Sequence, residues 1–433
     1  MRTLALLALA ACSDPAGPAV KRAPVAIVPA QVNRNVDILF DIEDSPGTSL
    51  GFLSNLRNNF PSFLDALTRD GLPNIHLGVI TSDLGTSAIE DGPGLPIGTG
   101  PGGCSGTGKA GNLQTNGTTL VSGNFIDDEA NLDGARVTNY TGQLADAFAA
   151  LASVGAAGCG FEQHLEAARR ALDNNPANAG FLRPDASLAV IVVGDEDDCS
   201  ATHSALFGDD TATFGPLQSF RCTRFGVTCD DGGATPDAMN TPGPKSGCHD
   251  NTSSPYLPAV ADYKAFLEGL KPDPRSVMVG AIVGDPAPVS VDLEPTPAGG
   301  TAIPHLVHSC SYVDSSGQRT DSDPAVRIAT LAGMMDRGVV ASECQQDLSG
   351  PLVAMARQIN SMTGSPCLVR DIALPSDCVV TDDAGRVPAC TKTGDTDCYL
   401  LVTDSVMCPF GQNLRLEHPG TPHGTTVVSC TVP

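Results

Sequence analysis

Acidic and hydroxyl side chains collect in three short stretches, each of which follows a run of apolar residues. The first stretch includes Glu43 and Ser45, the second is Ser82–Asp83, and the third is Asp195–Asp198. Carboxylate and hydroxyl oxygens from separate loops are the ligands that Mg²⁺ and Ca²⁺ prefer. We therefore predict a divalent-cation site where these three stretches meet. The alternative is that these are solvated loop residues.

The sequence contains no G-x-S-x-G, H-E-x-x-H or P-loop pattern, and its eight His are scattered. The run from Asp314 to Asp321 lacks the spacing of an EF-hand and is interpreted as a polar turn. Glu162 and Glu166 share one face of an expected helix and are interpreted as a solvated edge. We predict no catalytic residue and expect a protein that is not an enzyme. A metal-dependent hydrolase built into the acidic cleft is the alternative.

The acidic stretches require a scaffold that brings the ends of several strands together. Apolar runs at Asn35–Ile42, Ile75–Ser82 and Leu188–Val193 predict buried parallel strands, and Leu50–Leu67 has helical spacing that contains Pro61. Further helices are expected at Gln143–Val154, Glu162–Leu172, Val260–Leu270, Ala325–Met335 and Leu348–Met362, with a strand at Ser276–Val283. This alternation predicts an α/β fold with a doubly wound, mostly parallel sheet, whose ligands bind at the carboxyl ends of the strands.

The residue composition and hydrophobic pattern divide the chain into regions. Residues 34–365 carry the α/β pattern, interrupted by insertions rich in turn-forming residues at about 84–142 and 199–258. Residues 366–433 contain six Cys and short strand-like segments, which predict a small β-rich C-terminal module.

The chain has fifteen Cys. Apart from Cys12 they are even in number, which predicts disulfides and an oxidising compartment. Zinc binding is the alternative, but it requires short paired spacings and no C-x-x-C occurs. The disulfide candidates are Cys104, Cys159, Cys199, Cys222, Cys229, Cys248, Cys310, Cys344, Cys367, Cys378, Cys390, Cys398, Cys408 and Cys430.

The N-terminus is typical of an export signal. A charged start and the apolar run Leu4–Ala11 precede Cys12, and Leu9-Ala10-Ala11-Cys12 resembles the bacterial lipobox. This resemblance implies a lipoprotein signal peptide over residues 1–11, lipidation of Cys12, and attachment to the bacterial cell envelope, with Ser13 favouring the outer membrane. Residues 12–33 are expected to form a flexible spacer. An ordinary secretory signal is the alternative.

The charge of the chain restricts its partners. Lys and Arg total 25 against 49 Asp and Glu, a formal net charge of −24, so nucleic acid is excluded as a partner by repulsion. No stretch after the N-terminus has eighteen consecutive apolar residues, and membrane contact is expected only through the lipid anchor. The expected partner is a protein or a cell-envelope ligand.

Four strings resemble, in order, the von Willebrand factor A family, and particularly lipoproteins of the myxobacterial type. They are DILFDIEDSPGTS, LPNIHLGVITSDLGT, GCGFEQHLEAARRAL and LAVIVVGDEDDCS. The resemblance implies a metal-ion-dependent adhesion site, here degenerate. Glu43 replaces the first Asp, Ser45 matches the first Ser, Gly47 replaces the second Ser unless Thr48 or Ser49 shifts in, and Asp195 matches the last Asp. The resemblance therefore implies Glu43, Ser45 and Asp195 as metal ligands, with Asp197 as a further candidate, and Ca²⁺ or Mg²⁺ as the cofactor.

The function predicted from these observations is that of a tethered extracytoplasmic binding or adhesion module, dependent on a divalent cation. A structural envelope lipoprotein with an inactive cation site is the alternative. Neither the fold nor the resemblance identifies the ligand.

Overall fold

The computed structural model describes residues 22–28, 34–46, 50–69, 71–130, 135–295, 302–313, 317, 319–363, 368–391, 397–403, 410–417 and 424–432. The expected lipidation site Cys12, the signal peptide, two disulfide candidates (Cys367 and Cys408) and the loop residues Gly47, Thr48 and Ser49 lie outside the described residues.

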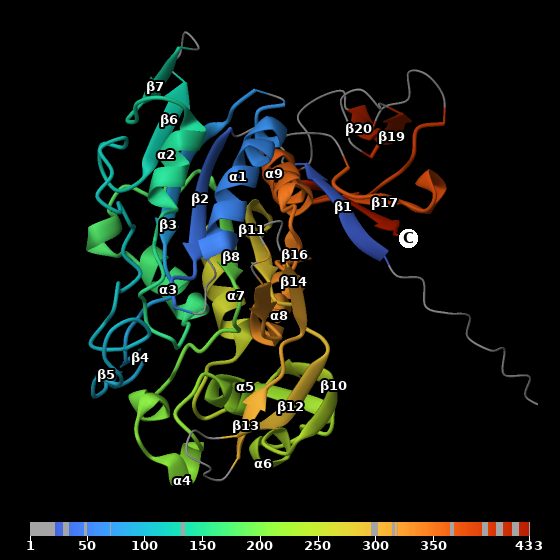
Figure 1. The fold of residues 1–433 in the computed structure, drawn as a ribbon. Coiled ribbons are helices and arrows are strands. Elements are labelled where there is room, and N and C mark those ends of the chain that lie inside the picture. The colour runs from blue at the N-terminus through green and yellow to red at the C-terminus, as the bar shows by residue number, and fades with distance from the viewer. Residues whose placement is uncertain are drawn as a thin grey trace, which may run out of the picture.

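The centre of the molecule is a mostly parallel sheet in the order β16-β11-β8-β2-β3-β6-β7 (Figure 1). Its strands are β2 (Asn35–Ile42), β3 (Asn74–Ile80), β6 (Ile126–Ala130), β7 (Arg136–Thr138), β8 (Ser187–Gly194), β11 (Val277–Val283) and β16 (Gly338–Ser342). The pairings from β3 through β2, β8 and β11 to β16 are parallel, and β6 and β7 extend the sheet antiparallel. The fold expected from the sequence, a doubly wound and mostly parallel α/β sheet, is confirmed.

Helices cover both faces of this sheet because its central strands are apolar on both sides. The helices α1 (Leu50–Leu67), α2 (Leu144–Leu151) and α9 (Ser349–Met362) pack on one face around a cluster of Phe rings. On the other face pack α3 (His164–Leu172), α7 (Val260–Gly269) and α8 (Val326–Met334). Phe40 and Phe60 in the first cluster have ring centroids 6.0 Å apart, and both rings are fully buried.

The expected insertions contain regular structure of their own. The region 84–142 supplies β4 (Ser87–Ala88), β5 (Gly92–Pro93) and the strands β6 and β7, of which β7 forms one edge of the central sheet. The second insertion and the segments after β11 form a four-stranded sheet in the order β13-β12-β10-β9, at the lower end of Figure 1. These shorter elements are α4 (Thr211–Phe214), α5 (Phe220–Gly226), β9 (Val227–Asp231), α6 (Pro236–Met239), β10 (Gly243–Asp250), β12 (Val289–Glu294), β13 (Ile303–Leu306), β14 (Cys310–Val313) and β15 (Arg319–Ser322), with 3-10 turns at Pro176–Asn178, Ser204–Phe207, Pro274–Ser276 and Pro375–Asp377.

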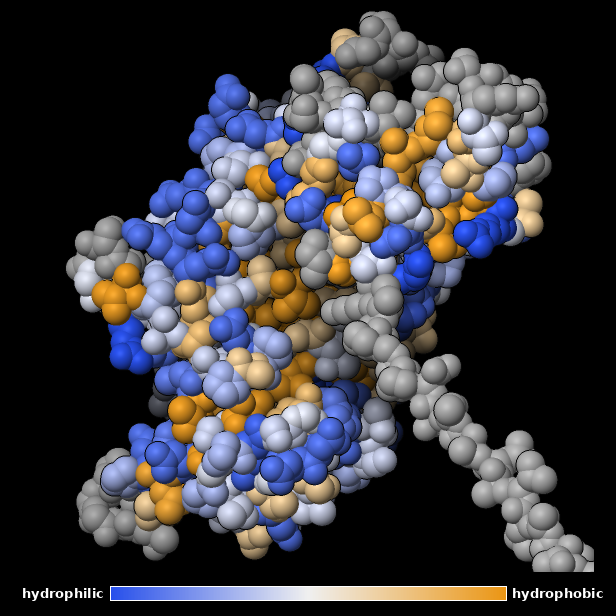
Figure 2. All heavy atoms as spheres, turned by 90° about the vertical axis from the view of Figure 1, so that its right-hand side faces the viewer, coloured by the Kyte–Doolittle hydropathy of each residue, from blue (hydrophilic) through white to orange (hydrophobic). Residues whose placement is uncertain are grey.

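One part of the expected spacer is instead a strand. Residues Arg22–Val28 form β1, which pairs antiparallel with β21 (Thr426–Thr431) of the C-terminal module. The sequence pattern missed it because β1 is rich in Ala and Val without clear alternation. The other strands of the module are β17 (Val379–Asp382), β18 (Gly385–Val387), β19 (Cys398–Thr403) and β20 (Gln412–Glu417). Figure 2 shows the side of the molecule that carries the C-terminal module, which lies in its upper part. Hydrophobic residues are visible in the hollow below the module.

Twelve of the predicted disulfide cysteines are bonded in pairs. The bonds join Cys104 to Cys159, Cys199 to Cys222, Cys229 to Cys248, Cys310 to Cys344, Cys378 to Cys430 and Cys390 to Cys398. These twelve are therefore not zinc ligands. Within the described ranges, no helix is both long enough and apolar enough to cross a membrane.

Candidate cation site at the carboxyl ends of the strands

The structure brings the three principal predicted ligands together. Glu43 follows β2 directly, and its backbone N–H donates to Val193 of β8 at 2.9 Å, which places it beside the end of that strand. The backbone N–H of Asp195 donates to Glu43 Oε2 at 2.7 Å, and the Ser45 hydroxyl donates to Glu43 Oε1 at 2.6 Å. All three residues are buried. Glu43, Ser45 and Asp195 thus form one cluster, as the sequence indicated.

Asp197, the further ligand suggested by the sequence, faces another element. Its carboxylate accepts the backbone N–H of Arg327 at 2.9 and 3.0 Å and that of Ile328 at 3.2 Å. These are N–H groups in the first turn of α8, which lack partners within the helix. Asp197 therefore satisfies the N-terminus of α8 in this structure, and its role as a metal ligand stays a prediction.

Two glutamates that the sequence did not assign complete the cluster. Glu162 precedes α3 and is 1 % exposed, so it is not the solvated edge residue we expected. Glu343 follows β16, and its backbone N–H donates to Val283 of β11 at 2.9 Å, the same arrangement as that of Glu43 beside β8. We call Glu43, Ser45, Glu162, Asp195 and Glu343 the carboxyl-end site.

The carboxylates of this site repel one another. Burial, followed by the charges of Glu196 and Glu43, raises the pKa of Glu162 well above its usual value. Burial, followed by Glu43 and Glu343, does the same to the pKa of Asp195. Burial and Glu43 raise the pKa of Glu343, although a hydrogen bond from the Ser322 hydroxyl opposes this. Each shift means that the ionised form is unfavourable here without a cation.

Several oxygens of the site have no partner within the described part of the chain. Both carboxylate oxygens of Glu162, Oδ1 of Asp195 and Oε2 of Glu343 are buried and accept no hydrogen bond. No Lys or Arg of the described residues lies within ion-pair distance of these three carboxylates. Beside the site lies a cavity of about 10 Å³, roughly the size that holds one water molecule, to which the site contributes Glu162 and which Glu196 and Asp323 also line. The site therefore offers several carboxylate oxygens that lack hydrogen-bond partners among the described residues, and a hard cation could bind to them.

Two positive charges of the protein lie at the border of the site. His164 Nδ1 lies 2.9 Å from Asp41 Oδ2, and both side chains are fully buried. Burial lowers the pKa of His164, but Asp41, Glu43 and Asp198 outweigh it and raise this pKa to about 9. Lys109 pairs with Asp44 at 2.5 Å. Because each cation is engaged by its own aspartate, neither neutralises Glu162 or Glu343.

Disulfides restrain the loops that hold these repelling groups. Cys159 precedes Glu162 closely and is bonded to Cys104, and Cys344 is adjacent to Glu343 and bonded to Cys310. Cys199, which ends the Asp195–Asp198 stretch, is bonded to Cys222. A covalent link reduces the freedom of a loop to move apart, so the charges stay close even when the solvent holds no cation.

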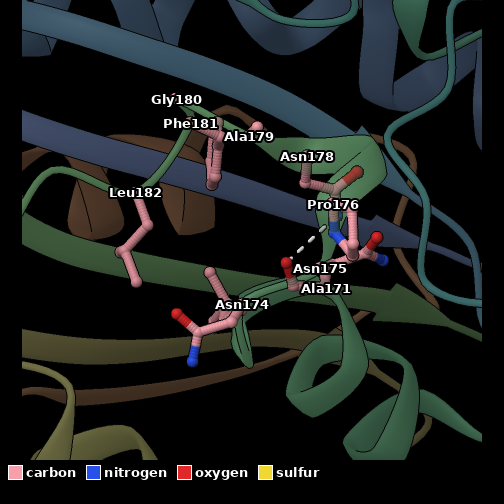
Figure 3. Close-up of a pocket in the computed structure, with 10 residues that line it drawn as sticks. Ala171, Asn174, Asn175, Pro176, Asn178, Ala179, Gly180, Phe181 and Leu182 are labelled. Carbon is pink, nitrogen blue, oxygen red and sulfur yellow. Dashed lines mark hydrogen bonds between the residues drawn. The ribbon is translucent and has the colours of Figure 1, made fainter.

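A second, larger cavity offers less chemistry. It has a volume of about 260 Å³ and lies beside the C-terminus of α3, where Asn174, Asn175, Phe181 and Leu182 contribute to its wall (Figure 3). The backbone N–H of Asn178 donates to the Asn175 carbonyl at 3.0 Å and fixes the turn. No ionisable side chain lines this cavity. We therefore place the functional site at the carboxyl ends of the strands.

No protein-family model matches the chain, and no curated protein sequence is similar to it. Among solved structures, the chain is similar to the conserved hypothetical protein BatB from Bacteroides thetaiotaomicron, with 14% identity, a TM-score of 0.28, and coverage of 76% of this chain and 98% of that one. It is also similar to a von Willebrand factor type A protein from Catenulispora acidiphila, with 12% identity, a TM-score of 0.30, and coverage of 95% and 63%. A third similar structure is the pilus adhesin RrgA from Streptococcus pneumoniae, with 12% identity, a TM-score of 0.22, and coverage of 94% and 58%. Similarities of this size establish no function, so the functional argument rests on the geometry of the carboxyl-end site.

Proposed function

We propose that this protein is an extracytoplasmic binding module whose carboxyl-end site holds a divalent cation, and that the surrounding loops recognise a protein or cell-envelope partner. Ca²⁺ fits the residues better than Mg²⁺, because Ca²⁺ accepts flexible sets of carboxylate oxygens whereas Mg²⁺ demands near-ideal octahedral geometry. Glu43, Glu162, Asp195 and Glu343 would provide carboxylate oxygens and Ser45 a hydroxyl.

The observation that carries this proposal is Glu162. Its side chain is 1 % exposed and neither of its oxygens accepts a hydrogen bond from the described residues. An ionised carboxylate buried without a partner costs several kcal/mol, roughly as estimated for transfer of a charge out of water. A bound cation would offset this cost, and it would hold together the loops after β2, β8 and β16.

Compartment and tethering belong to the same proposal. Six disulfides support an oxidising environment outside the cytoplasm. Lipidation of Cys12 would add a membrane anchor at the N-terminal side of β1. The strand β1 pairs with β21, so an anchored chain would carry its C-terminal module closest to the membrane.

We propose no catalytic role. His164 is the basic side chain nearest the cluster, and its Nε2 has no hydrogen-bond partner among the described residues. A nucleophile activated by a His base requires such a hydrogen bond, or a substrate that completes it. The chain's own residues instead serve to bind the cation and to keep the loops in place.

Calorimetric titration of the purified full chain with CaCl₂ and with MgCl₂, after treatment with chelator, tests the cation site. We expect one equivalent of Ca²⁺ to bind and Glu162→Gln to weaken it strongly. The matched control is Glu166→Gln, which removes the same charge one helical turn along, where Arg170 already neutralises it at 2.9 Å. Equal Ca²⁺ affinity in Glu162→Gln and the parent chain would contradict the proposal.

Partner recognition requires a separate measurement. Retention of the purified chain on cell-envelope preparations of the producing bacterium should be higher in Ca²⁺ than in chelator. Glu162→Gln should lose this difference and Glu166→Gln should keep it. Retention that is identical in Ca²⁺ and chelator for the parent chain would contradict a cation-dependent binding role.

A further inference from the structure

A second group of metal-ligand residues lies at the opposite, amino end of the parallel strands. It consists of His76 on β3 and of Asp127 and Glu129 on β6, whose ligand atoms all lie within 4.8 Å of one another. In Figure 1, β6 and β7, which belong to the first insertion, lie at the upper end of the sheet, whereas the sheet β13-β12-β10-β9 lies at the lower end. This group shares no residue with the carboxyl-end site and stands independently of the proposed function.

The sheet register fixes these side chains on one face. His76 is directly opposite Asp127 in the antiparallel pairing of β3 with β6. Glu129 lies two residues further along β6, so it points to the same face as Asp127, while Asp128 points to the other face and pairs with Arg136. The three groups are thus positioned by two paired strands rather than by a loop.

The protonation of His76 follows from its contacts. Its Nδ1 lies 2.8 Å from the Phe181 carbonyl oxygen, which can only accept, so Nδ1 carries a proton. Its Nε2 lies 3.8 Å from Asp127 Oδ1 and 3.7 Å from Glu129 Oε1. In the neutral ring Nε2 therefore directs a lone pair at two carboxylate oxygens, an arrangement that a cation between them would convert from repulsion into coordination.

Two further observations favour a ligand between these groups. The His76 side chain is 9 % exposed, and no hydrogen bond to its Nε2 is formed by the described residues. Asp127 Oδ1 is likewise buried and accepts no hydrogen bond from them. The Asp127 and Glu129 side chains are 43% and 44% exposed, so the gap can be reached from solvent.

The ligand chemistry favours zinc over Mg²⁺. Ligand atoms bound tetrahedrally to zinc at about 2.0–2.2 Å lie about 3.4 Å apart, whereas octahedral Mg²⁺ ligands at about 2.1 Å lie only about 3.0 Å apart. The separations of 3.7 and 3.8 Å between His76 Nε2 and the two carboxylate oxygens are longer than both values and are nearer to the tetrahedral one. An imidazole with two carboxylates is also a ligand set suited to zinc rather than to Mg²⁺.

The surroundings resemble the outer shell of known zinc ligands in their chemistry. A metal-bound His usually donates its other ring N–H to a backbone carbonyl or carboxylate, and a metal-bound carboxylate is itself hydrogen-bonded. Here Phe181 accepts from His76 Nδ1, and Arg183 donates to Glu129 Oε1 at 2.5 Å. Arg183 also bonds Asp37, which anchors it to β2.

From this geometry we propose that His76, Asp127 and Glu129 form an exchangeable zinc site between β3 and β6, next to the edge of the sheet that β7 forms. His76 Nε2 and one oxygen from each carboxylate would be the protein ligands. A fourth position would remain open to water or to a group from a partner. The site would allow Zn²⁺ to link this edge of the sheet to a second molecule.

Titration of the full chain with Zn²⁺ and with Co²⁺ tests this proposal. Free thiols are first blocked with iodoacetamide, and saturating Ca²⁺ is present to occupy the carboxyl-end site. We expect one equivalent of Zn²⁺ to bind, and Co²⁺ to give the intense visible absorption typical of tetrahedral coordination. His76→Gln and Asp127→Asn should each weaken Zn²⁺ binding by at least about tenfold, since even changes outside the ligand shell have effects of that size.

The matched control is His203→Gln. His203 also lies near two carboxylates, Glu90 and Asp91, each at 3.6 Å, but its side chain is 41% exposed. If a generic pairing of His with acids were sufficient, His203→Gln would lose as much Zn²⁺ affinity as His76→Gln, which would overturn the proposal. It is also overturned if the parent chain binds no Zn²⁺ or if His76→Gln binds it unchanged. Should His76→Gln fail to fold, the partly exposed Glu129→Gln and Asp127→Asn keep the test decisive.

Discussion

The two ends of the central strands treat buried carboxylates in opposite ways. At the amino end, Asp37 on β2 is fully buried and receives Arg183 Nε at 2.8 Å and Lys271 Nζ at 3.2 Å. At the carboxyl end, Glu162 and Glu343 are equally buried, yet none of the described Lys or Arg side chains pairs with them.

This difference separates structural acids from acids that await a ligand. Removing a charge from water costs several kcal/mol, so a buried carboxylate whose only role is structural should be paired within the protein, as Asp37 is. The chain has the means to do this elsewhere on the carboxyl side, where Arg327 pairs with Asp198 and Asp250. The carboxyl-end site is therefore a local exception to how this protein handles buried charge.

The largest effect is expected from breaking an ion pair at the amino ends of the strands. Lys271→Met should lower the free energy of unfolding by about 3–5 kcal/mol, because it leaves the Asp37 carboxylate buried with one of its two cations missing. Urea denaturation at pH 7 measures the change. Adding Asp37→Asn to the Lys271→Met variant should restore part of the loss, and a double variant less stable than Lys271→Met would contradict the assignment.

The next effect is the pH dependence of the free energy of unfolding that the ionisable groups at the carboxyl ends of the strands produce. Burial, followed by Asp323 and Glu43, raises the pKa of Glu196 to about 8, from 4.5. Between these two values the folded protein binds more protons than the unfolded chain, so stability must fall as pH rises. The pKa of His164, raised to about 9 from 6.5 by Asp41 against the effect of burial, acts in the same direction in its own interval.

In chelator we thus expect the free energy of unfolding to decrease by about 3–5 kcal/mol from pH 5 to pH 8, since each pKa unit corresponds to about 1.4 kcal/mol. Urea denaturation at several pH values checks this. Saturating Ca²⁺ should flatten the dependence, because the cation replaces protons as the source of positive charge. Stability that rises with pH in chelator would show that the cluster does not hold its protons.

The sequence predicted some of the acids at the carboxyl ends of the strands and missed others. The strands β2 and β8 were recognisable because their apolar runs are long and continuous, and the acids that follow them, Glu43 and Asp195, could be assigned to one rim from the rule for parallel sheets. Glu343 follows a strand in the same way. It was missed because β16 is a short edge strand, partly exposed, whose Val339 and Val340 are too brief a run to indicate a strand.

Glu162 and Asp197 show a different limit. Glu162 has helical spacing relative to Glu166, which suggested a solvated face, but it is buried, and its carbonyl accepts the backbone N–H of Cys199 from a distant segment at 2.6 Å. Asp197 sits in the same acidic run as Asp195, and only the position of α8 shows that it satisfies that helix's N-terminus. Both depend on contacts between segments far apart in the chain, which local patterns do not contain.

A smaller effect is expected when one carboxylate of the carboxyl-end site is neutralised by substitution. In chelator at pH 8, Glu162→Gln should raise the free energy of unfolding by about 1 kcal/mol, because the amide keeps the shape of the side chain and removes a carboxylate whose ionised form is disfavoured by burial. At pH 5 the gain should be smaller, since a larger fraction of the unfolded chain is protonated at this position there than at pH 8. Glu166→Gln, which breaks the ion pair with Arg170, should be destabilising at both pH values. A loss of stability in Glu162→Gln at pH 8 would mean that the carboxylate is paired after all.

The smallest effect supplies the scale for the others. Lys264 pairs with Glu268 one turn along α7 at 2.6 Å, a shorter contact than the 3.2 Å between Lys271 and Asp37. The α7 pair is partly exposed, however, so water already solvates both groups, and Lys264→Gln should cost only about 0.3–0.5 kcal/mol. Denaturation of both variants under one condition compares them. If Lys264→Gln were as damaging as Lys271→Met, burial would not be what makes a charge at the strand ends costly, and the contrast between those ends would lose its physical basis.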